Sequence, residues 1–125
     1  MPSSMIHYEP QNRVFNIQGA RSSYLIQILR DGYLVHLHWG GQVRSYHGGA
    51  AVRHADRAFS PNPYAEDRAF SLDTIPQEYP AYGNTDFRAP AIQLEWPDGS
   101  RITDFRYTSH RIFAGKPALA GLPAT

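Results

Sequence analysis

The run His36-Leu37-His38 holds the first candidates for metal binding in the sequence. Because side chains of a strand alternate between its two faces, the spacing predicts that both imidazoles lie on one face, where such a pair can bind a transition metal. A metal site needs a third ligand, and no spacing selects one of the other candidates, which are His7, His47, His54, Asp56 and His110. The sequence therefore predicts no metal site, and both histidines are interpreted as side chains that hydrogen-bond to their neighbours.

Trp39 and the acidic residues raise the question of carbohydrate chemistry. The indole of Trp39 can stack on the apolar face of a sugar, although packing in the core is the interpretation that its position favours. The 11 Asp and Glu residues allow a carboxylate pair for glycosidic cleavage, and a retaining mechanism needs two carboxyl groups about 5 Å apart. Sequence spacing does not give that distance, so the carboxylates by themselves define no site.

A long segment between Gly48 and Pro90 combines charged and aromatic side chains on a proline-rich backbone. Asp56-Arg57 precedes the run Phe59-Ser60-Pro61-Asn62-Pro63, and Asp67-Arg68 precedes Phe70-Ser71-Leu72-Asp73. Carboxylate acceptors and guanidinium donors suit the hydroxyls of a saccharide, and a stiff loop loses little entropy on binding. The alternative is that these Asp and Arg side chains hold the loop together through local salt bridges, and the residues alone leave both interpretations open.

Composition excludes several classes of function. With no cysteine, the chain has no disulfide, no thiolate nucleophile and no zinc finger. The 12 Lys and Arg residues against 11 Asp and Glu leave no excess positive charge for nucleic-acid binding. The sequence also lacks a phosphate-binding glycine loop, a G-x-S-x-G elbow and an apolar run that spans a membrane. We therefore expect a soluble, cytoplasmic protein with no cofactor, no nucleic-acid partner and no membrane contact.

Short apolar runs separated by turn signals predict an all-β fold, and 125 residues have room for one core. Three hairpins are predicted, formed by Met5–Tyr8 with Val14–Gln18, by Ser23–Arg30 with Tyr33–Trp39, and by Ile92–Trp96 with Arg101–Tyr107. Asp31-Gly32 suits a two-residue type I′ turn in the second, and Pro97-Asp98-Gly99-Ser100 suits a turn in the third. Gly40-Gly41 predicts a further reversal into a strand over Gln42–Tyr46.

Regular patterning disappears between Gly48 and Pro90, where prolines disfavour both helix and central strand. The aromatic side chains of this segment are costly to leave in water, and they are Phe59, Phe70, Tyr79, Tyr82 and Phe87. We therefore predict a long irregular loop that packs on the sheet and that carries function.

Several ordered motifs, spread over Met5 to Thr125, resemble bacterial α-galactosidases of glycoside hydrolase family 36. They are Ser23-Tyr24 with Gly32-Tyr33-Leu34-Val35-His36-Leu37-His38-Trp39-Gly40, Arg57-Ala58-Phe59-Ser60-Pro61-Asn62-Pro63, Ser71-Leu72-Asp73-Thr74 through Phe87-Arg88, and Thr103-Asp104-Phe105-Arg106-Tyr107 through Gly121-Leu122-Pro123-Ala124-Thr125. Motifs in a shared order are more specific than any one of them.

The resemblance implies a large retaining enzyme that removes terminal α-galactosyl units from oligosaccharides of the melibiose and raffinose type, without a cofactor. Its fold implies that residues 1–125 are the first part of an amino-terminal β-supersandwich domain, so the expected fold class is an incomplete antiparallel β-sandwich. The two catalytic aspartates of the family lie on a (β/α)₈ barrel, which is expected to be absent from this chain. No residue here is therefore assigned a catalytic role, and the chain alone is expected to be inactive.

The family also assembles as tetramers in which amino-terminal loops reach the active site of a neighbouring subunit. The matched positions in this chain are Asp56 and Arg68, which the resemblance implies as substrate-binding residues. Two departures are His38, where the family commonly has Tyr, and Ala69, where a hydroxyl residue is common. The competing hypotheses are a stand-alone carbohydrate-binding module and a purely structural domain whose loops mediate oligomerisation.

Overall fold

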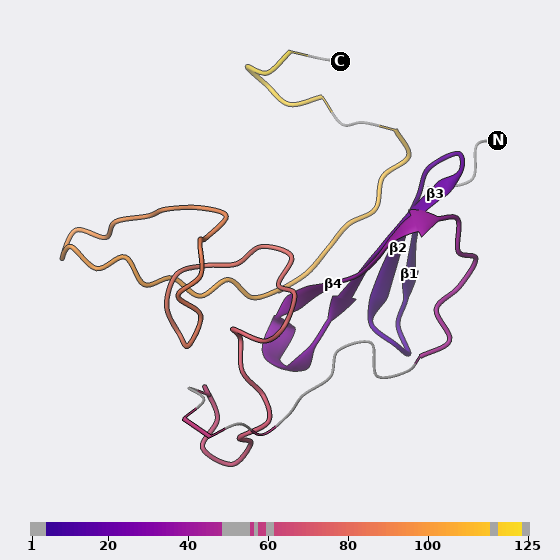
Figure 1. Cartoon of the computed structure of the whole chain (residues 1–125). Helices are drawn as coiled ribbons and strands as arrows, with labels where there is room; N and C mark the ends of the chain where they lie inside the picture. The colour runs from indigo at the N-terminus through magenta and orange to yellow at the C-terminus, as the bar shows by residue number, and fades with distance from the viewer. Residues whose placement is uncertain (1–4, 49–55, 57, 60–61, 116–117, 124–125) are drawn as a thin grey trace.

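The computed structural model describes residues 5–48, 56, 58–59, 62–115 and 118–123. Within them, residues 6–41 form one open antiparallel sheet, in the order β1-β2-β3-β4 (Figure 1). The strands are β1 (Ile6–Glu9), β2 (Val14–Gln18), β3 (Ser22–Ile28) and β4 (Leu34–Gly41). Apart from the single 3₁₀ turn η1 (Arg30–Gly32), the described part of the chain contains no helix, so the predicted all-β class is confirmed. None of it forms a helix long and apolar enough to cross a bilayer.

The first two predicted hairpins are confirmed. In β1 and β2, Glu9 pairs with Val14 across the connector, and in β3 and β4, Ile28 pairs with Leu34. Both central residues of the second turn have positive φ, 56° at Asp31 and 88° at Gly32. The Tyr33 N–H donates to the Arg30 carbonyl across them at 3.4 Å. These are the features of the type I′ turn that Asp-Gly predicts.

One face of the sheet is covered by the segment 42–48, which forms no strand. The Val43 carbonyl accepts hydrogen bonds from the side chains of Asn16, Gln18 and Ser23, at 2.8, 3.0 and 3.3 Å, and the Ser23 hydroxyl accepts the Val43 N–H at 2.9 Å. The prediction of a strand over Gln42–Tyr46 is therefore wrong. The backbone of this segment hydrogen-bonds to polar side chains of β2 and β3 rather than to the backbone of another strand.

The third predicted hairpin forms its turn but not its strands. The Trp96 N–H donates to the Ser100 carbonyl at 2.8 Å, and Arg101 pairs with Glu95 at 2.8 Å. Further along, however, the N–H groups of Thr103 and Tyr107 donate to the carbonyls of Tyr82 and Gly32, at 3.0 and 2.7 Å. The backbone after the turn is thus hydrogen-bonded to two separate loops. The segments before and after the turn therefore do not pair with each other as strands.

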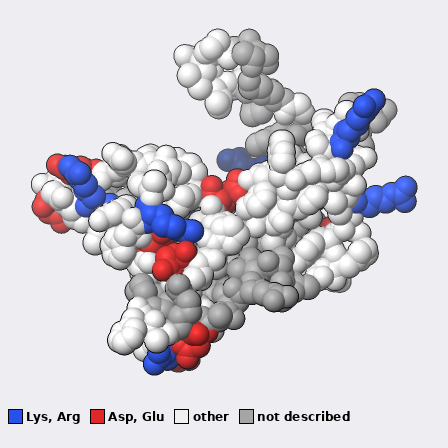
Figure 2. All heavy atoms as spheres, in the orientation of Figure 1, with Lys and Arg blue, Asp and Glu red and all other residues white. Residues whose placement is uncertain are grey.

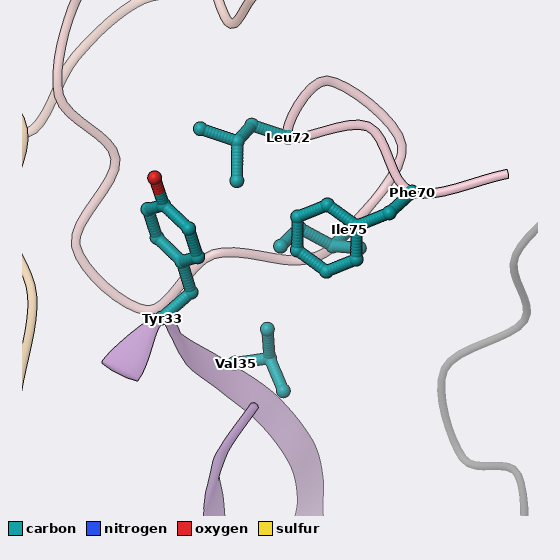
Figure 3. Packing of buried hydrophobic residues seen from close by; sticks show 5 residues of the cluster. All are labelled: Tyr33, Val35, Phe70, Leu72 and Ile75. Atoms are coloured by element: carbon teal, nitrogen blue, oxygen red, sulfur yellow. The ribbon is translucent and has the colours of Figure 1, made fainter. Parts of the chain in front are cut away.

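The main apolar core lies where the irregular segment meets the start of β4. Tyr33 and Val35 come from the sheet side, and Phe70, Leu72 and Ile75 come from the irregular segment, each 3% exposed or less. Figure 3 shows these side chains pointing toward one another from the two elements. The five side chains bury enough apolar surface to hold a segment that has no regular structure of its own.

The same segment pairs with the free edge of β4. The His36 N–H donates to the Pro76 carbonyl at 2.9 Å, and the Glu78 N–H donates to the Leu34 carbonyl at 2.8 Å. Between them, Val35 and Gln77 form an isolated antiparallel bridge. The irregular segment therefore pairs with backbone N–H and C=O groups of β4 that would otherwise lack partners at the edge of the sheet.

An ion pair between a buried aspartate and a half-exposed arginine fixes the second half of this segment. The Asp86 side chain is 1% exposed and receives Nε and Nη2 of Arg88, at 2.9 and 2.8 Å. The same Nη2 reaches the carbonyls of Leu72 and Ile75, both at 3.0 Å. Burial on its own raises the pKa of Asp86, but the hydrogen bonds from Arg88 outweigh it, and the pKa lies below its ordinary value.

The expectation that the loop aromatics are buried holds only for Phe70, at 3% exposed. Tyr79, Tyr82 and Phe87 are between 40% and 61% exposed, and Phe59 is fully exposed at 103%. Edge-to-face contacts of Tyr79 with Phe105 and of Tyr82 with Phe87 shelter some of these rings, at centroid distances of 5.8 and 5.3 Å. The segment is thus anchored through its aliphatic side chains and Phe70, and it presents several rings outward.

Replacing Leu72 with Ala should lower the free energy of unfolding by about 2–5 kcal/mol, because the side chain is 3% exposed and leaves a cavity. Leu119→Ala is the matched control, since Leu119 is 61% exposed and its loss should cost about 0.5 kcal/mol or less. Urea unfolding followed by circular dichroism measures both. Equal destabilisation by the two substitutions would contradict the core described here.

Replacing Asp86 with Asn should lower the free energy of unfolding at pH 7 by about 1–3 kcal/mol, because a buried charge-assisted contact is lost. The pKa of Asp86 in the folded protein lies below the ordinary value of 3.8. The ionised carboxylate therefore makes its full contribution to the free energy of unfolding well above pH 3.8, and this contribution is lost as the pH falls through 3.8 toward the folded pKa. The difference between the original protein and Asp86→Asn should therefore shrink in urea titrations run below about pH 4. A difference that stays constant with pH would show that the carboxylate charge is not what stabilises the fold.

Candidate functional site

The structure brings together the two residues that the sequence singles out for substrate binding. Arg68 Nε donates to Asp56 Oδ1 at 3.3 Å, and the two side chains are 64% and 61% exposed. An ion pair this exposed contributes little to stability, about 0–1 kcal/mol. The contact between Asp56 and Arg68 therefore adds little to the stability of the loop, and the role of the two residues in substrate binding stays a prediction.

The backbone beside Arg68 is held by Asp67. One carboxylate oxygen of Asp67 accepts the N–H groups of Ala69 and Phe70, at 3.1 and 3.3 Å, and the other accepts Arg30 Nη1 at 2.9 Å. Phe70 then enters the core. Arg68 thus projects from a short turn that is fixed on both sides.

Arg30 connects this turn to the sheet through several contacts. Its guanidinium carbon lies 3.6 Å from the centroid of the Tyr64 ring, and its Nη2 donates to Glu66 at 2.8 Å. The Tyr64 hydroxyl donates in turn to Asp31, and burial together with this hydrogen bond raises the pKa of Tyr64 to about 12. The turn between β3 and β4 therefore positions the loop that carries Arg68.

The Asp56–Arg68 pair retains binding capacity. Among the described residues, the contact uses only Nε and Oδ1, which leaves Asp56 Oδ2 as an acceptor and the Nη groups of Arg68 as donors. Exposed, oppositely charged groups that flank one another can receive and donate hydrogen bonds to adjacent hydroxyls of one ligand. Whether they contact substrate stays a prediction.

The sequence spacing predicts that His36 and His38 share a face of the sheet, and this prediction is wrong. A β-bulge shifts the register between Leu25 and Ile26, so that His38 pairs with Leu25 whereas His36 pairs with Ile26. Because neighbouring residues of β3 point to opposite faces, the two imidazoles do too. The described residues contain no group of three or more His, Asp or Glu side chains arranged to hold a metal ion.

Trp39 does not pack in the core, contrary to the interpretation favoured by its position. Its side chain is 71% exposed, and it lies opposite Tyr24 on β3. The sequence gives no sign of the partner that fixes Tyr24, which is Glu78 from the irregular segment. A contact between residues 54 positions apart across a loop has no local signal.

A surface pocket that the sequence does not predict lies between residues 82–90 and the two flanks of the turn at residues 96–100, which are residues 93–95 and Arg101. Its lining includes Tyr82, Phe87, Arg88, Leu94, Glu95 and Arg101. Figure 2 shows acidic and basic side chains close together over the irregular segments at the left and bottom of the view, and two basic side chains that project beside the sheet at the right.

Comparison with known families and structures identifies the fold. Residues 32–125 match the Glycosyl hydrolase family 36 N-terminal domain. The chain belongs to this family. The resemblance on which the sequence prediction rests is therefore confirmed.

Individual relatives agree with this assignment. Alpha-galactosidase AgaA of Geobacillus stearothermophilus is 56% identical over 96% of this chain and 16% of its own length, and alpha-galactosidase Mel36A of Lactobacillus acidophilus is 42% identical over 98% and 17%. The crystal structure of alpha-galactosidase AgaB of G. stearothermophilus superposes with a TM-score of 0.83, at 55% identity, over 96% of this chain and 16% of that chain. The chain thus spans about a sixth of the length of these relatives.

Proposed function

We propose that this chain is the amino-terminal β-sandwich part of a retaining α-galactosidase that removes terminal α-galactosyl residues from oligosaccharides such as melibiose and raffinose. The observation that carries the proposal is 56% identity to alpha-galactosidase AgaA over 96% of the chain. Solved structures of AgaA, 57% identical to this chain, contain raffinose and stachyose. A tetramer and a cytoplasmic location belong to the same proposal.

In this proposal the bond-breaking carboxylates lie outside the chain, and its own residues position substrate. Asp56 Oδ2 accepts hydrogen bonds from sugar hydroxyls, and the guanidinium of Arg68 donates to them. The loop that carries both residues reaches the active site of a neighbouring subunit. Its role is to orient a bound galactoside, which lowers the barrier without any covalent step on these side chains. The rigid attachment through Asp67 and Arg30 supports that role.

The direct test of the proposed activity is to express the full-length protein that carries this chain and to measure galactose release from melibiose and raffinose. We expect release by the full-length protein and none by the 125-residue chain alone. Failure of the full-length protein to hydrolyse any α-galactoside would reject the proposal, and hydrolysis by the chain alone would show that the reactive groups lie within it.

Within that enzyme, Asp56→Ala and Arg68→Ala should each lower kcat/KM by roughly 10- to 100-fold, the loss expected for one or two charge-assisted hydrogen bonds. The melting temperature should stay nearly unchanged, because the pair is exposed. Glu95→Gln is a matched control, since it removes one charge of another exposed ion pair, Glu95 with Arg101.

Unaltered kinetics in both Asp56 and Arg68 variants would remove these residues from the substrate site. Loss of the assembled state on sedimentation, with normal turnover by the separated subunits, would instead assign the loop a purely structural role in oligomerisation.

A further inference from the structure

We infer that Trp39, together with Tyr24, His36 and Glu78, forms a binding platform for a pyranose ring of a saccharide. This inference goes beyond the proposed function, whose substrate contacts are Asp56 and Arg68 and which needs none of these four residues.

Trp39 presents its ring to solvent from a rigid base. The residue lies in β4 directly opposite Tyr24 of β3, and the two rings meet at 70° with centroids 5.4 Å apart. An edge-to-face contact of this kind fixes the orientation of the indole, yet 71% of the side chain remains exposed. A large, flat apolar surface held in one orientation suits the C–H face of a sugar ring.

Polar groups lie around Tyr24, the ring that Trp39 contacts. The Tyr24 hydroxyl donates to Oε1 of Glu78, and burial together with this hydrogen bond raises the pKa of Tyr24 to about 12, so the phenol stays protonated. The His36 imidazole lies 5.4 Å from the Tyr24 ring, centroid to centroid. Within the described residues, neither the His36 ring nor Oε2 of Glu78 has a hydrogen-bond partner. The carboxylate of Glu78 and the imidazole of His36, which both contact Tyr24, are the kinds of acceptor and donor that sugar hydroxyls need.

The three supporting segments are fixed by backbone hydrogen bonds. Strands β3 and β4 form one ladder, and the Glu78 N–H donates to the Leu34 carbonyl at 2.8 Å. The platform is thus formed before any ligand arrives, which reduces the entropy lost on binding. The combination of an open apolar ring with neutral and anionic hydrogen-bonding groups favours an uncharged polyhydroxylated ligand over an anion.

Trp96 provides the comparison within the same chain. It is also exposed, at 52%, but its indole N–H is already bonded to the Ile102 carbonyl at 3.0 Å. Trp39 has no such bond among the described residues. The two tryptophans therefore allow a matched pair of substitutions.

The experiment titrates the ¹⁵N-labelled 125-residue chain with melibiose and raffinose and follows the two indole N–H resonances, with the acyclic polyol sorbitol as a control ligand. We expect the Trp39 resonance to shift saturably with either sugar and not with sorbitol. Trp39→Ala should weaken binding roughly tenfold or more, Glu78→Gln should weaken it severalfold, and Trp96→Phe should leave it within twofold.

Sugar binding that survives Trp39→Ala within twofold, or a Trp39 resonance that ignores both sugars, would overturn the inference. The inference would also be overturned if a second copy of the chain occupied the Trp39 surface. Sedimentation velocity would then show a dimer that Trp39→Ala dissociates and on which sugar has no effect. None of these outcomes depends on hydrolysis by the full-length protein, so failure here leaves the proposed function standing.

Discussion

The packing of the irregular segment against the first residues of β4 is the interaction on which the rest of the described structure depends. A segment with no helix or strand must satisfy its backbone groups elsewhere and must find apolar neighbours for its side chains. Both needs are met at one place. Tyr33 and Val35 cover Phe70, Leu72 and Ile75, and the adjacent edge of β4 takes the backbone of residues 76–78. Arg88 closes the arrangement from the other side through the carbonyls of Leu72 and Ile75.

This arrangement holds polar side chains of the irregular segment in fixed positions, which a flexible loop does not do. The side chain of Arg68 projects two residues before a buried phenylalanine, and the turn at Arg30 holds the same stretch through Asp67. The side chain of Glu78 follows directly on the β4 pairing and reaches Tyr24. The two polar constellations, one at Asp56 and Arg68 and one at Trp39, are thus supported by opposite ends of one anchored segment. Rigid presentation of these groups is what the proposed positioning of a carbohydrate requires.

Local turn signals made the first two hairpins predictable. The first has a connector with Pro and Asn over residues 9–13, and in the second Asp31-Gly32 adopts positive φ at both positions. The failures are all non-local. Gly40-Gly41 signals a reversal, but the side chains that bind the Val43 carbonyl lie 20 to 27 residues away. The bulge that separates His36 from His38 depends on the register with β3. Exposure of Trp39 and the contact between Asp56 and Arg68 are likewise set by tertiary packing, and motif resemblance, rather than spacing, pointed to the latter pair.

Hydrogen exchange at the Glu78 amide tests most directly whether the irregular segment is part of the sheet. This N–H is bonded to the Leu34 carbonyl, and the Ile28 N–H of β3 is bonded to the Arg13 carbonyl. We predict that the two amides exchange equally slowly, because both hydrogen bonds open only when the sheet opens. Exchange of the Glu78 amide at the rate of an unstructured peptide, while the Ile28 amide stays protected, would contradict this prediction.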